Sequence, residues 1–301
     1  MNNNSQISLV ICTFNREKFL PVALKSLTTI TTDKTLFEIV LINNNSTDST
    51  EKICKDFILN NPRLKIQYHV EPGKGLSAAR NRGINESKSE LVCFLDDDAE
   101  VTPDYVDIAL EFFSTHPNID AMGGKIIPVY ETGEEPKWLS KPLWGLVTKV
   151  DWGNKARKYP YSKYPPGASM IFRKKVFNEI GLFNTDLFLR SDDKFIFRQM
   201  EAYGKSFMYY PKLVAYHHID AFRVTFESVK KISLVVGASE RVRLKDAGIL
   251  LNLAKIIEYL LKLAAAVILA TGFLFKLEFK KAEYIIKNRW LTLLGYFNTK
   301  L

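Results

Sequence analysis

The chain has 301 residues, of which 47% are hydrophobic and 25% are charged. This composition is typical of a folded globular protein and excludes an intrinsically disordered one. The formal net charge is +9, and the segment from Arg223 onward, with fourteen basic and six acidic residues, accounts for +8 of it. Because these basic residues are interleaved with apolar helix faces, they do not indicate nucleic-acid binding.

The three cysteines, Cys12, Cys54 and Cys93, lack metal-ligand spacing, and two of them lie in apolar runs. We expect them to be reduced and buried rather than to form a disulfide framework. The N-terminal sequence has no basic region and only a short apolar stretch, so it does not resemble a secretory signal. The N-terminal part of the chain is therefore expected in the cytoplasm.

Short apolar runs alternate with longer amphipathic segments over the first 120 residues. We expect strands at residues 7–12, 38–42, 64–70 and 91–95. We expect helices at residues 18–28, from 46 or 47 to about 59, at 75–87 and from 103 onward. This alternation predicts an α/β fold, with a mainly parallel, Rossmann-like sheet and helices on both of its faces.

In such sheets the ligand lies beyond the carboxyl ends of the strands. Three polar loops follow the first, second and fourth expected strands: Thr13–Arg16, Asn43–Ser46 and Asp96–Asp98. We therefore expect these loops to lie side by side at one edge of the sheet.

The loop Asp96–Asp98 places three adjacent carboxylates directly after an apolar strand. Like charges at this spacing repel one another and need a positive partner. Oxygen ligands suit magnesium or manganese, which commonly also bind substrate phosphates. The chain has no zinc-binding, EF-hand, Walker or GxGxxG pattern. A solvated turn is the alternative, but the neighbouring polar loops favour a metal-phosphate site.

Four segments occur in the order and spacing of family 2 glycosyltransferases with the GT-A fold, the kind that builds bacterial cell-surface polysaccharides and glycolipids. They are SLVICTFNREKFLPVALKSL, EIVLINNNSTDSTEKI, EPGKGLSAARNRGINESKSELVCFLDDDAEVTPDYV and LFLRSDDKFIFRQMEAYGKSFMYYPKLVAYHH. The resemblance covers roughly residues 5 to 220. It implies a nucleotide-diphosphate sugar as donor, Mn2+ or Mg2+ as cofactor, and inversion of the anomeric centre.

The resemblance also implies roles for the donor-binding residues. Thr13, Phe14 and Arg16 match the loop that holds the base and ribose. Asn43 stands where the family usually has an aspartate that reads uracil, and Asn45 continues that motif. An asparagine presents an acceptor but no charge, so a UDP-sugar is implied less strongly than in other members.

For the phosphates and the metal, the resemblance implies that Arg80 faces the diphosphate. Asp96 and Asp98 would hold the metal, and Asp97 would face the ribose. A histidine at the position of His217 approaches the metal or the diphosphate in relatives, although it could equally be hydrogen-bonded in place.

Asp192 matches the family's catalytic base, which removes the proton of the acceptor hydroxyl. Ser191 replaces the glutamate that usually precedes it. Capping of the following helix is the alternative for Asp192 and the favoured role for Asp193. The small segment Gly167–Ser169 matches the lining of the sugar pocket. Aromatic loops before it are expected to recognise the acceptor, with core packing as the alternative.

The C-terminal segment contains an uncharged run of 13 residues, Leu263–Phe275. This is shorter than the roughly 20 residues that span a bilayer. We expect an amphipathic helix lying in the membrane interface, with basic residues facing anionic headgroups: Lys276, Lys280, Lys281, Lys287 and Arg289. A re-entrant hairpin, a partner-binding helical pair and a buried helical layer remain alternatives.

We therefore expect residues 1–222 to form a catalytic domain, with a nucleotide-binding half (1–120) and an acceptor-binding half (121–222). Residues 223–301 would form a basic helical tail that attaches the enzyme to the inner face of the cell membrane. The expected acceptor is a saccharide or a lipid-linked sugar. Two alternatives are an inactive nucleotide-sugar-binding scaffold and a sugar nucleotidyltransferase.

Overall fold

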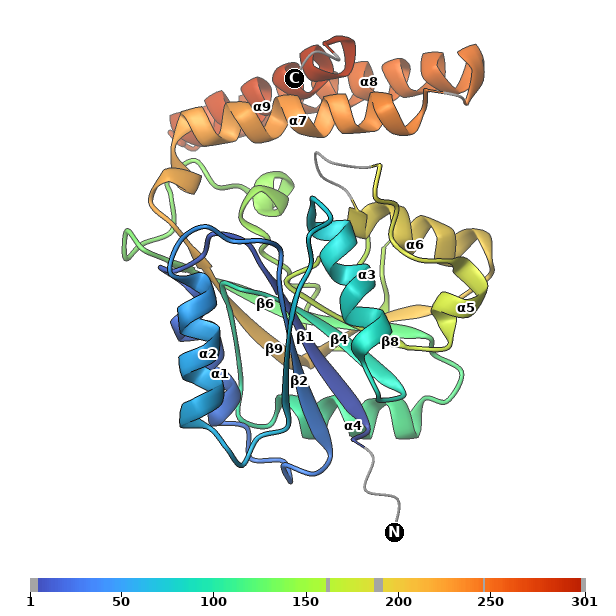
Figure 1. Ribbon diagram of the computed structural model, residues 1–301. Helices are drawn as coiled ribbons and strands as arrows, with labels where there is room; N and C mark the ends of the chain where they lie inside the picture. Colours follow the sequence, from blue (N-terminus) through green and yellow to red (C-terminus); the bar gives the residue numbers. More distant parts are fainter. Residues whose placement is uncertain (1–4, 161–162, 187–191, 246, 299–301) are drawn as a thin grey trace. The chain divides into compact units, whose positions relative to one another are not determined.

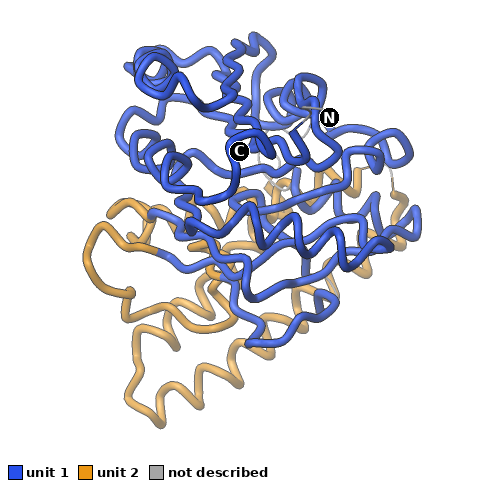
Figure 2. The backbone as a smooth tube through the Cα atoms, turned by 90° about the horizontal axis from the view of Figure 1, so that it is seen from below, with its two compact units in different colours: residues 1–128, 150–188, 192–218 blue, residues 129–149, 189–191, 219–301 orange. Residues whose placement is uncertain are grey.

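The computed structural model describes residues 5–160, 163–186, 192–245 and 247–298. The chain divides into two compact units, drawn in blue and orange in Figure 2. Unit 1 takes the described residues within 1–128, 150–188 and 192–218, and unit 2 takes those within 129–149 and 219–301. Unit 2 thus combines the C-terminal residues from 219 onward with the segment 129–149, and the expected domain boundary at residue 223 stays a prediction. The finer division of the catalytic domain at residue 120 stays a prediction.

The sheet is mixed and mainly parallel, as predicted (Figure 1). Its order is β3-β2-β1-β4-β8-β6-β9-β5, with β7 paired to β9. The strands β3, β2, β1 and β4 are parallel, whereas β8 runs antiparallel to both β4 and β6. The strands are β1 (Ile7–Thr13), β2 (Phe37–Asn43), β3 (Ile66–Val70), β4 (Leu91–Asp96), β5 (Ala99–Val101), β6 (Ala121–Tyr130), β7 (Arg157–Lys158), β8 (Ser169–Arg173) and β9 (Phe207–Ile219).

Helices cover both faces of the sheet in unit 1 (Figure 1). Successive residues of a strand point to opposite faces, so Leu9 and Val10 on β1 belong to different apolar clusters. One cluster is covered by α1 (Leu20–Thr28), α2 (Thr50–Asn60) and α4 (Tyr105–Thr115). The other is covered by α3 (Leu76–Glu86), α5 (Val176–Ile180) and α6 (Asp192–Ala202). The two apolar layers hold the strand ends at fixed positions.

Unit 2 consists of two short 3-10 turns and three long helices. They are η1 (Lys141–Val147), η2 (Phe222–Val224), α7 (Phe226–Arg243), α8 (Gly248–Phe275) and α9 (Phe279–Phe297). The helices α7 and α9 approach closely, because Gly237 and Gly295 lie where they cross. A Cβ atom on Gly295 would lie 2.1 Å from the carbonyl oxygen of Leu234. A buried hydrogen bond of 2.8 Å from Asn288 Nδ2 to Ser233 Oγ joins the same two helices.

Replacing Gly295 with alanine should destabilise unit 2, because the added Cβ would clash with the backbone of α7. Overpacking of this kind costs about 1–3 kcal/mol, measurable as a fall in the free energy of unfolding in urea. Gly272→Ala on α8 is the control, since an added Cβ there meets no atom within 4 Å. The control should be neutral or slightly stabilising. Equal effects of the two substitutions would contradict the close crossing.

Candidate active site

The three polar loops lie side by side, as the sequence predicted. In the parallel register Thr13 at the end of β1 is paired with Asn43 at the end of β2. On its other side β1 is paired with β4, with Cys12 opposite Asp96. Each of the loops therefore starts from the same edge of the sheet, so their side chains meet there.

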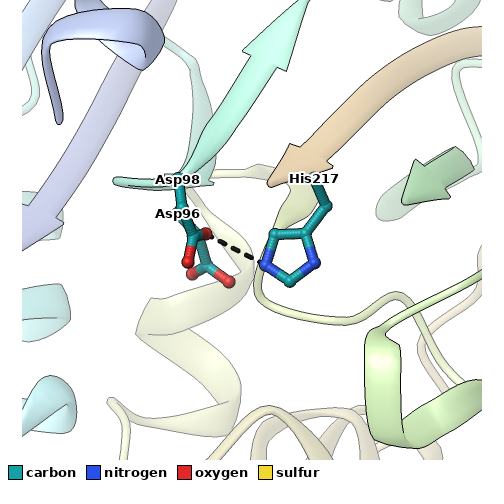
Figure 3. A group of neighbouring side chains, drawn as sticks. All are labelled: Asp96, Asp98 and His217. Atoms are coloured by element: carbon teal, nitrogen blue, oxygen red, sulfur yellow. Dashed lines mark ion pairs between the residues drawn. The ribbon is translucent and has the colours of Figure 1, made fainter. Parts of the chain in front are cut away.

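A cluster of potential metal ligands lies at this edge. One ligand atom from each of Asp96, Asp98 and His217 lies within 4.8 Å of the others, and the side chains point toward one another in Figure 3. The histidine comes from β9, where Ala99 of β5 is its antiparallel partner. This register brings His217 Nε2 to 2.9 Å from Asp98 Oδ1. The structure thus brings together the three residues predicted to bind metal.

The cluster fits a divalent cation. It combines two carboxylates with an imidazole, and His217 is only 1% exposed. Within the described part of the chain, the buried Nδ1 atom of His217 has no hydrogen-bond partner. Carboxylate oxygens are the ligands that magnesium and manganese prefer, and imidazole is a common ligand of transition metals. Asp97 is not part of the cluster: β4 ends at Asp96, and Asp97 and Asp98 form the turn before β5.

Arg16 supplies positive charge to the triplet. Its Nε atom lies 3.0 Å from Asp97 Oδ1, and its Nη2 atom lies 2.6 Å from Asp98 Oδ2. Burial raises the pKa of Asp97 to about 7, although the charge of Arg16 acts in the opposite direction. The guanidinium therefore lies on the acidic triplet rather than beside a base-binding surface. Its predicted contact with the base or ribose stays a prediction.

The residues expected to read the base differ in accessibility. Asn43 is 1% exposed, and its amide donates to the hydroxyl of Tyr68 (2.9 Å) and accepts from the backbone N–H of Ser46 (2.9 Å). Both ends of the side chain thus hold the loop in shape, which favours a structural role. Phe14, by contrast, is 57% exposed, and Asn45 is exposed with a left-handed φ of 60°. Their binding roles stay predictions.

A second group of charges lies beside the metal cluster. Arg80 on α3 is 3% exposed, and its Nη1 atom forms a buried ion pair with Asp192 Oδ2 at the start of α6. Its Nη2 atom lies 3.5 Å from Asp96 Oδ1. One guanidinium thus connects the predicted base to a predicted metal ligand. Burial and the charge of Asp192 raise the pKa of the adjacent Asp193 to about 6, and Ser191 lies outside the described residues.

The aromatic residues expected to recognise the acceptor contribute to apolar cores. Trp138 is 5% exposed and stacks on Tyr284 of α9, with ring centroids 5.0 Å apart. Tyr159 is 9% exposed, and Tyr164 stacks on Phe197 of α6. Core packing, the alternative considered from the sequence, accounts for these three rings. Acceptor recognition by the loops stays a prediction, and Tyr161 lies outside the described residues.

Besides the ion pair of Arg80 with Asp192, sequence reasoning missed two further kinds of contact in the site. The ion pairs between Arg16 and the aspartates link residues 81 and 82 positions apart. Gly167 lies against Arg80, so that an added Cβ would be 2.1 Å from Nη2. No local pattern signals either contact, because both depend on the order of the strands.

Comparison with known proteins identifies the family. Residues 8–181 match the model described as glycosyl transferase family 2. A glucosyl-dolichyl phosphate glucuronosyltransferase of Haloferax volcanii is 21% identical over 246 residues, 79% of this chain and 77% of that protein. The putative glycosyltransferase EpsH of Bacillus subtilis is 33% identical over 99 residues, 33% of this chain, and the chain spans only 28% of the length of that relative.

Solved structures agree with the fold. The mannosyltransferase PcManGT of Pyrobaculum calidifontis, in complex with GDP-Man and Mn2+, aligns with a TM-score of 0.65 and 17% identity, over 96% of this chain and 87% of that one. TarS 1-349 of S. aureus, in complex with UDP, aligns with a TM-score of 0.56 and 16% identity, over 95% of this chain and 90% of that one. At these identities the likeness establishes the fold.

Replacing Asp98 with alanine should weaken Mn2+ binding by more than about ten-fold, because one of the three clustered ligands is lost. Electron paramagnetic resonance of free Mn2+ measures this affinity without any sugar donor. Asp104→Ala is the matched control, since Asp104 is exposed and its side chain does not cap α4. Wild-type Mn2+ affinity in the Asp98→Ala variant would contradict the assignment.

Proposed function

The chain belongs to glycosyl transferase family 2, and from this premise we propose that it is a metal-dependent, inverting enzyme. It transfers a sugar from a nucleotide-sugar donor, and a UDP-sugar is the donor to test first. The proposed acceptor is a saccharide or a lipid-linked sugar used in cell-surface glycan synthesis. The observation that carries this proposal is the adjacency of the metal cluster to Asp192, with Arg80 in contact with both.

Asp96, Asp98 and His217 are the residues that would hold the cation. When bound, a divalent cation supplies positive charge that stabilises the diphosphate leaving group. Arg16, with its guanidinium on Asp97 and Asp98, adds a second positive charge beside the same position. Arg16 is thus a cation of the chain itself on the proposed leaving-group side of the reaction.

Asp192 acts as the base on the acceptor side. Its carboxylate takes the proton of the acceptor hydroxyl while that oxygen forms the new bond to the anomeric carbon. The bond between the anomeric carbon and the diphosphate breaks, and the nucleoside diphosphate leaves with its electron pair. Attack opposite the leaving group inverts the anomeric centre. Arg80 holds the carboxylate of Asp192 in a buried ion pair.

Relatives bear on the donor and acceptor. A structure of TarS contains UDP, and that of PcManGT contains GDP-Man, so the fold accepts more than one nucleotide. Asn43 is buried, and its amide donates to Tyr68 and accepts from Ser46, which supports base recognition by other groups. The name of the Haloferax volcanii relative includes a dolichyl phosphate, which supports a lipid-linked acceptor for this chain.

Replacing Asp192 with asparagine should lower kcat by about 10²–10⁴-fold, because an amide cannot accept the proton. Release of nucleoside diphosphate is measured with Mn2+ and a panel of nucleotide sugars, and Mn2+ affinity should stay at the wild-type value. Equal turnover in wild type and Asp192→Asn would contradict the assignment of the base. Pyrophosphate release from a nucleoside triphosphate would instead indicate a nucleotidyltransferase.

We also propose that unit 2 binds a membrane surface through α8. Two polar side chains of this helix face α7 and α9: Lys255 Nζ lies 3.0 Å from Glu240 Oε1, and Asn252 accepts a hydrogen bond of 2.6 Å from Tyr296. The opposite side exposes a row of large apolar residues: Ile249, Leu250, Leu253, Ile257, Leu261, Val267, Ile268, Leu274 and Phe275. A helix side that faces water usually carries polar side chains instead.

An anionic lipid surface is the occupant that fits this face. Within the described part of the chain, no helix is long and apolar enough to cross a membrane. The exposed Lys276 and Lys280 lie beside the apolar residues at the turn from α8 to α9, as charge complementarity to headgroups requires. Four of the five basic residues expected to face lipid also have partners within unit 2: Lys280 and Lys287 pair with Glu283, Lys281 pairs with Glu278, and Arg289 donates to the Pro142 carbonyl.

A triple variant in which serine replaces Leu250, Ile257 and Ile268 should bind phosphatidylcholine–phosphatidylglycerol vesicles more weakly. Each of the three substitutions removes an exposed apolar side chain. Cosedimentation measures the bound fraction, which added salt should also reduce. Leu59→Ser on α2 is the control, since Leu59 is 76% exposed and belongs to unit 1. Unchanged vesicle binding, or a dimer that the triple variant dissociates, would contradict the proposal.

A further inference from the structure

Contacts with two carboxylates and two aromatic rings hold Arg80. Its Cζ atom lies 5.8 and 5.5 Å from the ring centroids of Phe94 and Phe183, which are themselves 5.5 Å apart, so both rings lie on the same side of the guanidinium. Its two terminal nitrogens face Asp192 and Asp96. These contacts fix the position of the cation.

The neighbouring residues support this position. Asn81, the next residue along α3, accepts a hydrogen bond of 2.9 Å from the backbone N–H of Phe183 and donates one of 2.9 Å to its carbonyl oxygen. This pair of hydrogen bonds holds the ring of Phe183 against Arg80. On another side Gly167 approaches so closely that an added Cβ would lie 2.1 Å from Nη2. A side chain at position 167 would therefore displace the guanidinium.

The negative charges of Asp192 and Asp96 explain why the Arg80 guanidinium can be buried beside them. Burial alone would lower the pKa of Arg80, but the charges of Asp192 and Asp96 raise it above its usual value. Arginine suits this place because its planar fork presents separate N–H groups to two carboxylates, whereas lysine presents a single point charge. At 3% exposure, with its nitrogens facing protein carboxylates, Arg80 has little surface left for a diphosphate.

We propose that Arg80 is a positioning residue that sets the distance and orientation between the base Asp192 and the metal ligand Asp96, and that it does not bind the diphosphate. This inference rests on the proposed function, because it assigns Arg80 its effect through the base. In-line transfer needs the acceptor oxygen and the leaving diphosphate on opposite sides of one carbon. A displacement of about 1 Å in such a site can cost about 10²-fold in rate.

The test compares kcat with affinity in two variants that disturb Arg80 differently. Arg80→Lys keeps the charge but loses the fork, and Gly167→Ala keeps every charge but pushes the guanidinium aside. Both should lower kcat for nucleoside-diphosphate release by more than about ten-fold. The dissociation constants for Mn2+ alone, and for the nucleoside diphosphate that wild type releases, should stay within about three-fold. Gly145→Ala is the control, because an added Cβ there meets no atom within 4 Å.

A double variant separates positioning from a general loss of structure. If Arg80 acts through Asp192, then Arg80→Lys combined with Asp192→Asn should be no slower than Asp192→Asn alone. If Arg80→Lys does not fold, Gly167→Ala combined with Asp192→Asn carries the same comparison. Additive losses of kcat in the double variant would overturn the proposal.

Other outcomes also decide the matter. A wild-type kcat in either single variant would overturn the proposal. A rise in the nucleotide dissociation constant as large as the fall in kcat would also overturn it, because Arg80 would then be a diphosphate ligand. Failure of the proposed function looks different. In that case wild type releases no nucleoside diphosphate from any nucleotide sugar, or Asp192→Asn turns over normally, and the inference falls with it.

Discussion

The convergence of four carboxylates at one edge of the sheet is the constraint on which the rest of the site depends. Asp96, Asp97 and Asp98 follow β4, and Asp192 reaches the same place from α6. Buried carboxylates cannot remain ionised together without positive charge beside them. Among the described residues of unit 1, Arg16 and Arg80 supply positive charge to these carboxylates. The metal cluster could bind a divalent cation, which would add more.

Arg16 and Arg80 contact different carboxylates of this group. Arg16 is about a third exposed and lies on the side of Asp97 and Asp98, where its guanidinium can respond when a cation and a diphosphate arrive. Arg80 is enclosed and tied to Asp192 and Asp96. In the proposed mechanism Arg16 can therefore adjust its contacts, while Arg80 keeps the proposed base, Asp192, in place. Arg16 thus lies beside the leaving group of that mechanism, and Arg80 lies beside the base.

The strands and their terminal loops were predictable because apolar runs and polar loops follow a simple local pattern. The fourth strand, expected at residues 91–95, is found at Leu91–Asp96. The partners of Arg80 were not predictable in this way, since Asp192 lies 112 residues away and the ion pair depends on how α6 packs on the sheet. The same limit applied to Asn43, whose burial depends on Tyr68 from the neighbouring strand.

For α8, the uncharged run indicated an apolar face, but periodicity alone does not say which face packs inward. The burial of Tyr259, Ala266 and Ala270 shows which side of α8 packs inward, and the opposite side exposes a row of large apolar residues.

The most direct test of this account is anomalous diffraction from crystals grown with Mn2+ and UDP. The account predicts a manganese peak bounded by Asp96, Asp98 and His217, with the guanidinium of Arg80 still on Asp192. A manganese peak away from those three residues, or Arg80 turned from Asp192 onto the diphosphate, would contradict it.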